Sequence, residues 1–213
     1  MGIKIHGIPH GATLRVLAAA NEKELQYQLV YVDLPSGAHK QPSFLSLNPF
    51  GQIPAFEDGD LTLFESRAIT KYIAHTYEEK GTPLTYKTRK QMADQAIWME
   101  VEAHQFDPVV SKLARELVYN FYFNKPTDEA IVEENKSKLA KILDVYEARL
   151  SKSKYLAGDL FTLADLHHLP GLQSLMGTQI SKLFEERPYV CQWCKDILAR
   201  PAWEKALALQ KQI

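Results

Sequence analysis

The sequence predicts two parts, an α/β domain followed by an all-α domain. Strand patterns occur only in the first third of the chain. Residues 3–6 alternate in polarity, residues 29–34 contain β-branched side chains, and Asp58-Gly59 separates two short apolar runs as in a tight β-hairpin. From Thr88 onward the apolar residues recur at helical spacing, and no convincing strand pattern follows.

The first part has the element order of a thioredoxin-like domain. Helical spacing over residues 13–25 links the first two strand patterns, and a short helix or loop over 42–47 follows. Pro54 cannot donate a hydrogen bond within a sheet, so we expect it to be a structural residue at a strand start or in a turn. After the hairpin, a helix is expected to begin at Ser66, where backbone N–H groups can hold a carboxylate.

The Gly and Pro residues of the segment 79–83 indicate a linker between the two parts. We therefore expect a first domain over residues 1–82, a linker over 83–89 and an all-helical domain over 90–213.

The helical part carries one clear folding signal. Thr162 lies three residues before Asp165, so the threonine can cap a helix while the acid bonds back to it. We therefore interpret both residues as structural, although His167 and His168 stand close by. The histidines and nearby acids do not have metal-ligand spacing, and no metal is expected.

Cys191-Gln192-Trp193-Cys194 has the spacing of a redox-active pair. However, such a pair belongs at the end of the first strand of a thioredoxin-like domain, whereas these cysteines lie in a late helical segment. We therefore expect two reduced thiols in an intracellular protein.

Composition narrows the function classes. The 213 residues contain 24% charged side chains and carry a formal net charge of −1, which is not the footprint of a nucleic-acid or anionic membrane partner. No apolar run reaches the length of a membrane span, and Met1 leads directly into a strand pattern without a signal peptide. We expect a cytosolic (cytoplasmic) protein that binds neither nucleic acid nor membrane.

Two consecutive runs are the most specific motif, Asn48-Pro-Phe-Gly-Gln-Ile-Pro-Ala-Phe-Glu-Asp-Gly-Asp60 and Phe64-Glu-Ser-Arg-Ala-Ile69. They resemble the glutathione-binding core of cytosolic glutathione transferases. Together with the segments 37–40 and 101–108, they are similar to the plant-specific phi class, over essentially the whole chain. The resemblance implies the glutathione transferase fold, a homodimer, glutathione as co-substrate and a role in detoxification or stress.

The resemblance also implies the roles of particular residues. The glycine-end carboxylate of glutathione would be neutralised by His39 and Lys40, the cysteinyl backbone bound by Gln52 and Ile53, and the γ-glutamyl end held by Glu65 and Ser66. It further implies a cis bond between Ile53 and Pro54. The helical domain would contribute the hydrophobic acceptor site, for which Tyr119, Phe121, Tyr122 and Phe123 are candidates, although aromatic runs at helical spacing are more often core.

One departure from the phi pattern concerns catalysis. Phi enzymes usually carry a serine before the first helix, but this chain reads His10-Gly-Ala-Thr-Leu-Arg-Val16, with a loop one residue shorter and Gly11 near the place of the serine. Thr13 is the nearest hydroxyl and our tentative catalytic residue, and a first-turn cap is an equally good role for it. His10 or backbone N–H groups at the helix start are the alternatives for activating the thiol.

Two function classes follow. The first is a transferase that conjugates the glutathione thiol to hydrophobic electrophiles, with peroxide reduction as a variant. Because the usual serine is missing, the second is a glutathione-binding, non-catalytic carrier of apolar small molecules.

Overall fold

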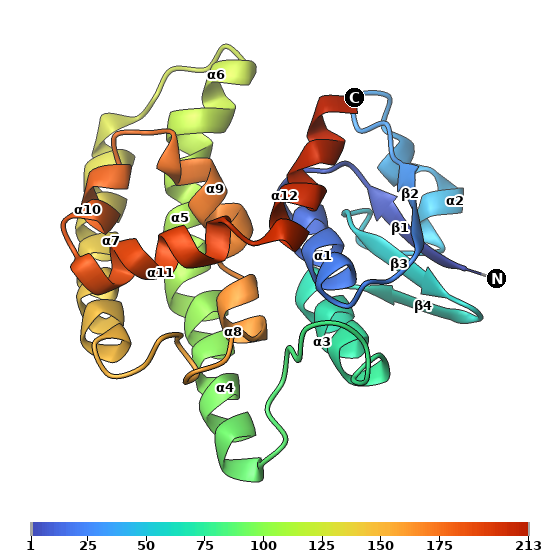
Figure 1. Cartoon of the computed structure of the whole chain (residues 1–213). Helices are drawn as coiled ribbons and strands as arrows, with labels where there is room; N and C mark the ends of the chain where they lie inside the picture. Colours follow the sequence, from blue (N-terminus) through green and yellow to red (C-terminus); the bar gives the residue numbers. More distant parts are fainter. Residues whose placement is uncertain (1, 213) are drawn as a thin grey trace. The chain divides into compact units, whose positions relative to one another are not determined.

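The computed structural model describes residues 2–212, which form two compact units (Figure 1). The first unit holds the chain up to Leu84 together with the C-terminal segment from Arg200, and the second holds Thr85–Ala199. A sheet with helices makes up the first unit and helices alone make up the second, as the predicted fold class requires. The sequence assigned residues 90–213 to one domain, whereas by contacts the segment from Arg200 groups with the N-terminal unit.

The first unit contains a four-stranded sheet in the order β2-β1-β3-β4. β1 pairs with β2 in parallel and with β3 antiparallel, and β3 pairs antiparallel with β4. Gly59, with φ of +65°, forms the turn of the predicted hairpin, where a positive φ favours glycine. The strands are β1 (Ile3–Gly7), β2 (Tyr27–Tyr31), β3 (Ala55–Asp58) and β4 (Leu61–Phe64).

Three helices of this unit pack together: α1 (Gly11–Glu22) contacts α3 (Ser66–Thr76) and also α12 (Pro201–Ala208). Leu17, Ile69 and Ile73 are completely buried in this packing. The short helices η1 (Ala38–Lys40) and α2 (Pro42–Leu45) follow β2, and η4 (Leu209–Gln212) follows α12. Phe44 of α2 forms a small apolar cluster with Val32 and Ala55.

An ion pair explains why the C-terminal segment belongs to the first unit. Arg200 donates from Nη2 to Oε2 of Glu22 over 2.7 Å, and the Thr82 hydroxyl donates to the same oxygen over 2.6 Å. Glu22 is buried, so its carboxylate depends on these partners. The contact joins the end of α1, the segment that follows α3 and the start of α12.

The second unit is helical throughout the residues that the structure describes. Residues 89–122 form its first long helix, which contains two π-helical turns, η2 and η3. Such turns often occur near functional sites. Among residues 2–212, no helix is long and apolar enough to cross a membrane. The helices are α4 (Arg89–Val101), η2 (Glu102–Phe106), α5 (Asp107–Ala114), η3 (Arg115–Tyr119), α6 (Asn120–Tyr122), α7 (Glu129–Leu150), α8 (Leu163–Leu166), α9 (Leu169–Met176), α10 (Ser181–Glu185) and α11 (Pro188–Leu198).

The predicted capping box is present at the start of α8. The Thr162 hydroxyl accepts from the Ala164 N–H, and Oδ2 of Asp165 accepts from the Thr162 N–H over 3.1 Å. Oδ1 of Asp165 also accepts from the Leu156 N–H and from Nε1 of Trp193, each over 3.0 Å. Asp165 therefore joins three segments of the helical core, which supports its structural interpretation.

The histidines and cysteines of this unit also have structural surroundings. His168 is buried, with its ring nitrogens 2.8 Å from the Tyr146 hydroxyl and from the Ala164 carbonyl oxygen. Cys191 and Cys194 are free cysteines of α11. Burial raises the pKa of the Cys194 thiol far above its usual value, so the reactive thiolate is disfavoured there.

We expect Asp165→Asn to lower the free energy of unfolding by about 2 kcal/mol at pH 7, because an amide nitrogen would then face N–H donors. Urea denaturation measures the change, and Asp159→Asn, at an exposed position, is the matched control. Equal stability of the two variants would contradict the role of Asp165.

The same carboxyl group predicts a pH dependence. Burial raises the pKa of Asp165 to about 6, against about 3.9 for an exposed aspartate. Between these values the folded chain binds the extra proton, so this group's contribution to stability falls as pH rises from about 4 to 6. The stability difference between the parent and Asp165→Asn should therefore decrease over that interval, and a flat difference would argue against the raised pKa.

Candidate functional site

The sheet brings the ends of four segments to one edge. Gly7 at the end of β1 lies opposite Tyr31 at the end of β2, while His6 lies opposite Ala55 at the start of β3. Ala55 in turn lies opposite Phe64 at the end of β4. The loop before α1, the loop after β2, the loop before β3 and the start of α3 therefore leave the sheet at the same edge. All six residues predicted to bind glutathione lie on these segments.

The first pair, His39 and Lys40, packs against the loop before β3. Nζ of Lys40 donates to the carbonyl oxygens of Phe50 and Gly51 over 3.2 and 2.8 Å. A Cβ at Gly51 would lie 2.7 Å from the His39 carbonyl oxygen, so this close approach, together with φ of +57°, requires glycine. Nδ1 of His39 is buried, and no hydrogen-bond partner for it occurs among the described residues. The Lys40 ammonium therefore keeps one N–H that can donate to a ligand, whereas Nδ1 of His39 lies inside the protein.

Asn48 shapes the loop that carries the second pair, and the sequence analysis gave it no role of its own. Its side chain is buried, with Nδ2 donating to the Gln52 carbonyl oxygen over 2.6 Å and Oδ1 accepting from the Phe50 N–H over 3.0 Å. Asn before Pro is a turn signal that could have indicated this role. Asn48 holds the backbone of Gln52 in place.

In that loop, the Ile53–Pro54 peptide bond is cis, as the resemblance implied. Pro54 is buried directly before β3, which fits its predicted structural role. Ile53 is half-buried against the apolar cluster around Phe44, whereas the Gln52 side chain is exposed. The amide of Gln52 is therefore accessible to a ligand.

The third pair stands at the start of α3. Glu65 is exposed with φ of +66°, a conformation that is uncommon for residues other than glycine and that concentrates at functional sites. Its carbonyl oxygen accepts from the Ile69 N–H over 2.9 Å, so it directly precedes the first helical turn. Ser66 follows as the first residue of the helix and is 6% exposed.

Arg15 of α1 is a site residue for which the sequence predicted no role of its own. Its Nη1 donates to the Ser66 Oγ over 2.8 Å, and its side chain is buried. Because a guanidinium can only donate, the Ser66 hydroxyl hydrogen is left to donate elsewhere. A buried positive charge behind a hydroxyl at a helix N-terminus favours a bound carboxylate. An arginine within the apolar run of α1 was the signal available in the sequence.

His10 is the residue directly before α1, with extended backbone angles. Its Nδ1 lies 2.7 Å from the Pro9 carbonyl oxygen, which can only accept, and 3.0 Å from Nε2 of Gln210, which can only donate, so these two contacts require opposite tautomers of the ring. Partial burial lowers the pKa of His10 from its usual value, so the imidazole is neutral at pH 7. A neutral histidine therefore stands beside the positive end of the helix dipole.

Thr13, the tentative catalytic hydroxyl, lies inside the core. It is 0% exposed, and a Cβ at Gly7 would lie 2.5 Å from its Oγ1, so the hydroxyl points at the Gly7 backbone. Among the described residues, Oγ1 has no hydrogen-bond partner. The α1 start also shows no side-chain cap, so the alternative role of Thr13 as a capping residue is not observed. A fully buried hydroxyl does not reach a ligand at the surface, and this geometry gives the catalytic assignment no support.

The helical unit exposes the aromatic residues that were expected to belong more often to the core. Phe121, Tyr122 and Phe123 are 79%, 73% and 69% exposed.

Within residues 2–212, no group of three or more His, Cys, Asp or Glu side chains could hold a metal ion.

The site and fold can be compared with known proteins. Residues 1–75 match the family model of the glutathione S-transferase N-terminal domain, and residues 110–201 match that of the C-terminal domain. A glutathione S-transferase of Silene vulgaris is 62% identical over 216 residues, covering all of both chains.

Solved structures agree with this result. Glutathione transferase F7 from Populus trichocarpa has a TM-score of 0.94 at 46% identity, covering 98% of this chain and 99% of that one. A maize glutathione S-transferase I in complex with an atrazine glutathione conjugate has a TM-score of 0.91 at 37% identity, covering 99% of each chain.

The chain belongs to the glutathione S-transferase family. Within it, the relatives that carry the letter F place it in the phi class, as the sequence motifs indicated. The predicted fold and enzyme class are thereby confirmed, and glutathione is its co-substrate.

We expect Ser66→Ala to weaken glutathione binding about 10- to 100-fold, because the ligand carboxylate loses a charge-assisted hydrogen bond of about 1.5–3 kcal/mol. The loss of folding stability should be smaller, about 1 kcal/mol. Titration calorimetry measures the affinity, with Ser43→Ala at an exposed position of α2 as control. Unchanged affinity in Ser66→Ala would mean that the γ-glutamyl end binds elsewhere.

Proposed function

We propose that this transferase conjugates glutathione to apolar electrophiles and holds glutathione at the sheet edge described above. The supporting observation is that β-sheet pairing collects all six predicted binding residues at that edge, with Arg15 behind Ser66. The complex of the maize relative with an atrazine conjugate supports an apolar aromatic acceptor. The binding residues are His39, Lys40, Gln52, Ile53, Glu65 and Ser66.

The charges of glutathione match this edge. Glutathione carries two carboxylates and one ammonium group. Lys40 and the half-buried His39 would receive the glycine carboxylate, while Ser66, backed by Arg15, would receive the γ-glutamyl carboxylate. Glu65 is exposed beside Ser66 and would pair with the ammonium group.

For thiol activation we propose the start of α1 and His10 in place of Thr13. The helix N-terminus favours a thiolate, as it does for reactive cysteines. The basic ring nitrogen of the neutral His10 would accept the thiol proton and release it to water, because a protonated imidazole is unfavourable at the positive end of the helix. The thiolate sulfur then attacks the electrophilic carbon and the leaving group departs with its electron pair.

Two substitutions separate the candidates. His10→Ala should lower kcat/KM with an activated aryl halide about 10- to 100-fold. It should also raise the pKa of the thiol of bound glutathione, which a titration of thiolate absorbance measures. Thr13→Val should leave both unchanged and keep or slightly raise stability, since it removes a buried hydroxyl that lacks a partner.

A lower kcat/KM and a raised thiol pKa in Thr13→Val, with no change in His10→Ala, would return the catalytic role to Thr13. If the parent binds glutathione without ionising its thiol and without turnover, the carrier hypothesis replaces conjugation.

For conjugation and carriage alike, exposed aromatic residues of the helical unit support an apolar ligand. We propose Phe121, Tyr122 and Phe123, together with the partly exposed Tyr119, as part of the acceptor site that this unit contributes.

We also propose a homodimer in the cytosol. One face of α4 and η2 carries an open, mostly apolar groove of about 600 Å³, lined by Ala93, Ala96, Ile97 and Val101 together with Glu100, His104 and Gln105. Ile97 and Met92 are 57% and 42% exposed, which is costly for a surface left in water. A second copy of the chain would cover this face, and the two free cysteines fit a reducing compartment.

Ile97→Glu is expected to place a charge in this apolar contact and shift the chain to monomers near 24.3 kDa. Sedimentation at micromolar concentration measures the mass. Lys90→Glu, at an exposed position near the start of the same helix, serves as control. A dimer that survives Ile97→Glu would place the interface on another face.

A further inference from the structure

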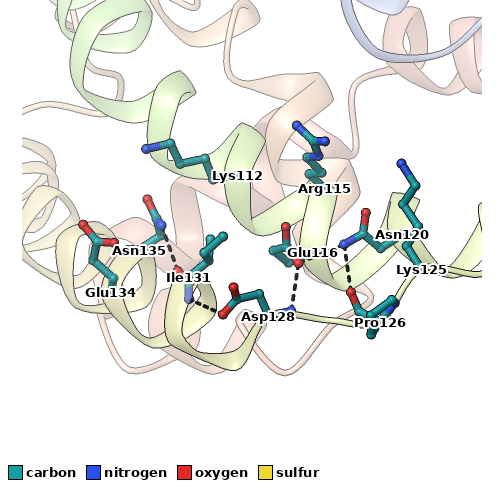
Figure 2. A pocket seen from close by; sticks show the side chains of 10 residues that line it. All are labelled: Lys112, Arg115, Glu116, Asn120, Lys125, Pro126, Asp128, Ile131, Glu134 and Asn135. Atoms are coloured by element: carbon teal, nitrogen blue, oxygen red, sulfur yellow. Dashed lines mark hydrogen bonds between the residues drawn. The ribbon is translucent and has the colours of Figure 1, made fainter.

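The helical unit contains a second cavity, of about 770 Å³, which the proposed glutathione chemistry does not use (Figure 2). It lies between the end of the long first helix and the first two turns of α7, so all of it belongs to one unit. Small-molecule sites commonly have volumes of about 300–1,000 Å³. Its lining consists of Lys112, Arg115, Glu116, Asn120, Lys125, Pro126, Asp128, Ile131, Glu134 and Asn135.

Asn135 is the most informative of these residues. Its side chain is 1% exposed, and its Nδ2 donates to the Ile131 carbonyl oxygen over 2.8 Å. Because that carbonyl can only accept, the amide orientation is fixed and Oδ1 points the other way, as Figure 2 shows. Among the described residues, Oδ1 has no hydrogen-bond partner. A buried acceptor without a donor is unfavourable, so the cavity lacks a donor at this position.

The acidic side chains of the lining already have partners. Glu116 accepts from Nδ2 of Asn120 over 2.8 Å and from the Asp128 N–H over 2.9 Å. Asp128 caps α7 by accepting from two backbone N–H groups, and Glu134 accepts from Lys138 over 2.5 Å. Their negative charges are therefore committed to the fold.

The basic side chains are not committed in this way. Across the part of the chain that the structure describes, Lys112, Arg115 and Lys125 make no side-chain hydrogen bond or ion pair. Lys112 is close enough to Glu134 to contribute to the lowered pKa of that carboxyl group, after the larger effect of Lys138. What the cavity offers a ligand is therefore three cationic groups and one buried acceptor.

We propose that this cavity binds a small hydroxylated phosphate monoester, of the size of a polyol or sugar phosphate. The phosphate oxygens accept from Lys112 and Arg115, whose guanidinium suits bidentate contact with phosphate. A hydroxyl group of the organic part donates to Oδ1 of Asn135. An inorganic anion would satisfy the cations but would leave most of the cavity empty.

The test uses the full-length protein with glutathione present, so that the proposed glutathione site at the sheet edge is occupied. Glycerol phosphate, propyl phosphate and inorganic phosphate are titrated by calorimetry or NMR. We expect saturable millimolar binding of glycerol phosphate, at least threefold tighter than propyl phosphate, which has the charge but not the hydroxyl groups, and tighter than inorganic phosphate.

Variants assign the contacts. Lys112→Gln and Arg115→Gln should each weaken glycerol phosphate binding about three- to tenfold, whereas Lys141→Gln, at an exposed position of α7 outside the cavity, should not. Asn135→Leu should abolish the preference for glycerol phosphate over propyl phosphate. Glutathione conjugation by the lysine and arginine variants should equal that of the parent, which separates this site from the catalytic one.

Three results would overturn the proposal: no saturable binding of glycerol phosphate, equal binding of propyl or inorganic phosphate by the parent, or binding that Lys112→Gln and Arg115→Gln leave unchanged. The lysine and arginine variants alter exposed positions, so they test the site even if Asn135→Leu folds poorly.

Discussion

The pairing of β1 with β2 on one side and with β3 on the other is the constraint on which the site depends. Because one pairing is parallel and the other antiparallel, the end of β1, the end of β2 and the start of β3 meet at the same edge. The hairpin then returns β4 to that edge, next to the start of α3. Segments separated by more than fifty residues in the chain therefore present their backbone and side chains together. No single segment could bind a tripeptide at both ends.

Polar side chains at this edge lie in two layers. In the proposed binding mode Ser66 and Gln52 contact glutathione, whereas Arg15 and Asn48 lie behind them and donate to the Ser66 hydroxyl and the Gln52 carbonyl oxygen over 2.8 and 2.6 Å. The supporting residues are buried, so their own polar groups must be satisfied by these contacts. Under this proposal the core holds the binding geometry, so binding carries little cost for ordering these side chains.

The fold is kept at the start of α1 although the loop before it is one residue shorter than in the phi pattern. The position before the helix is held by His10, while the nearby hydroxyl of Thr13 turns inward against Gly7. Thr13 fills a space that only a glycine partner leaves open, which is a packing role. The helix N-terminus remains, and its dipole does not depend on any side chain.

The order of elements, the Asp58-Gly59 hairpin, the Thr162–Asp165 capping box and the motif runs 48–60 and 64–69 could be recognised from the sequence, because these follow from local backbone chemistry and short-range spacing. Only the tertiary contacts show that Arg15 lies behind Ser66, that Thr13 is buried, and that the segment from Arg200 packs with the first unit, where Arg200 pairs with Glu22. Tertiary contacts also leave Phe121 and its neighbours exposed and place Asn135 in the lining of a cavity. Each of these depends on contacts between residues distant in the chain, and no local pattern encodes which side of a helix the rest of the fold will cover.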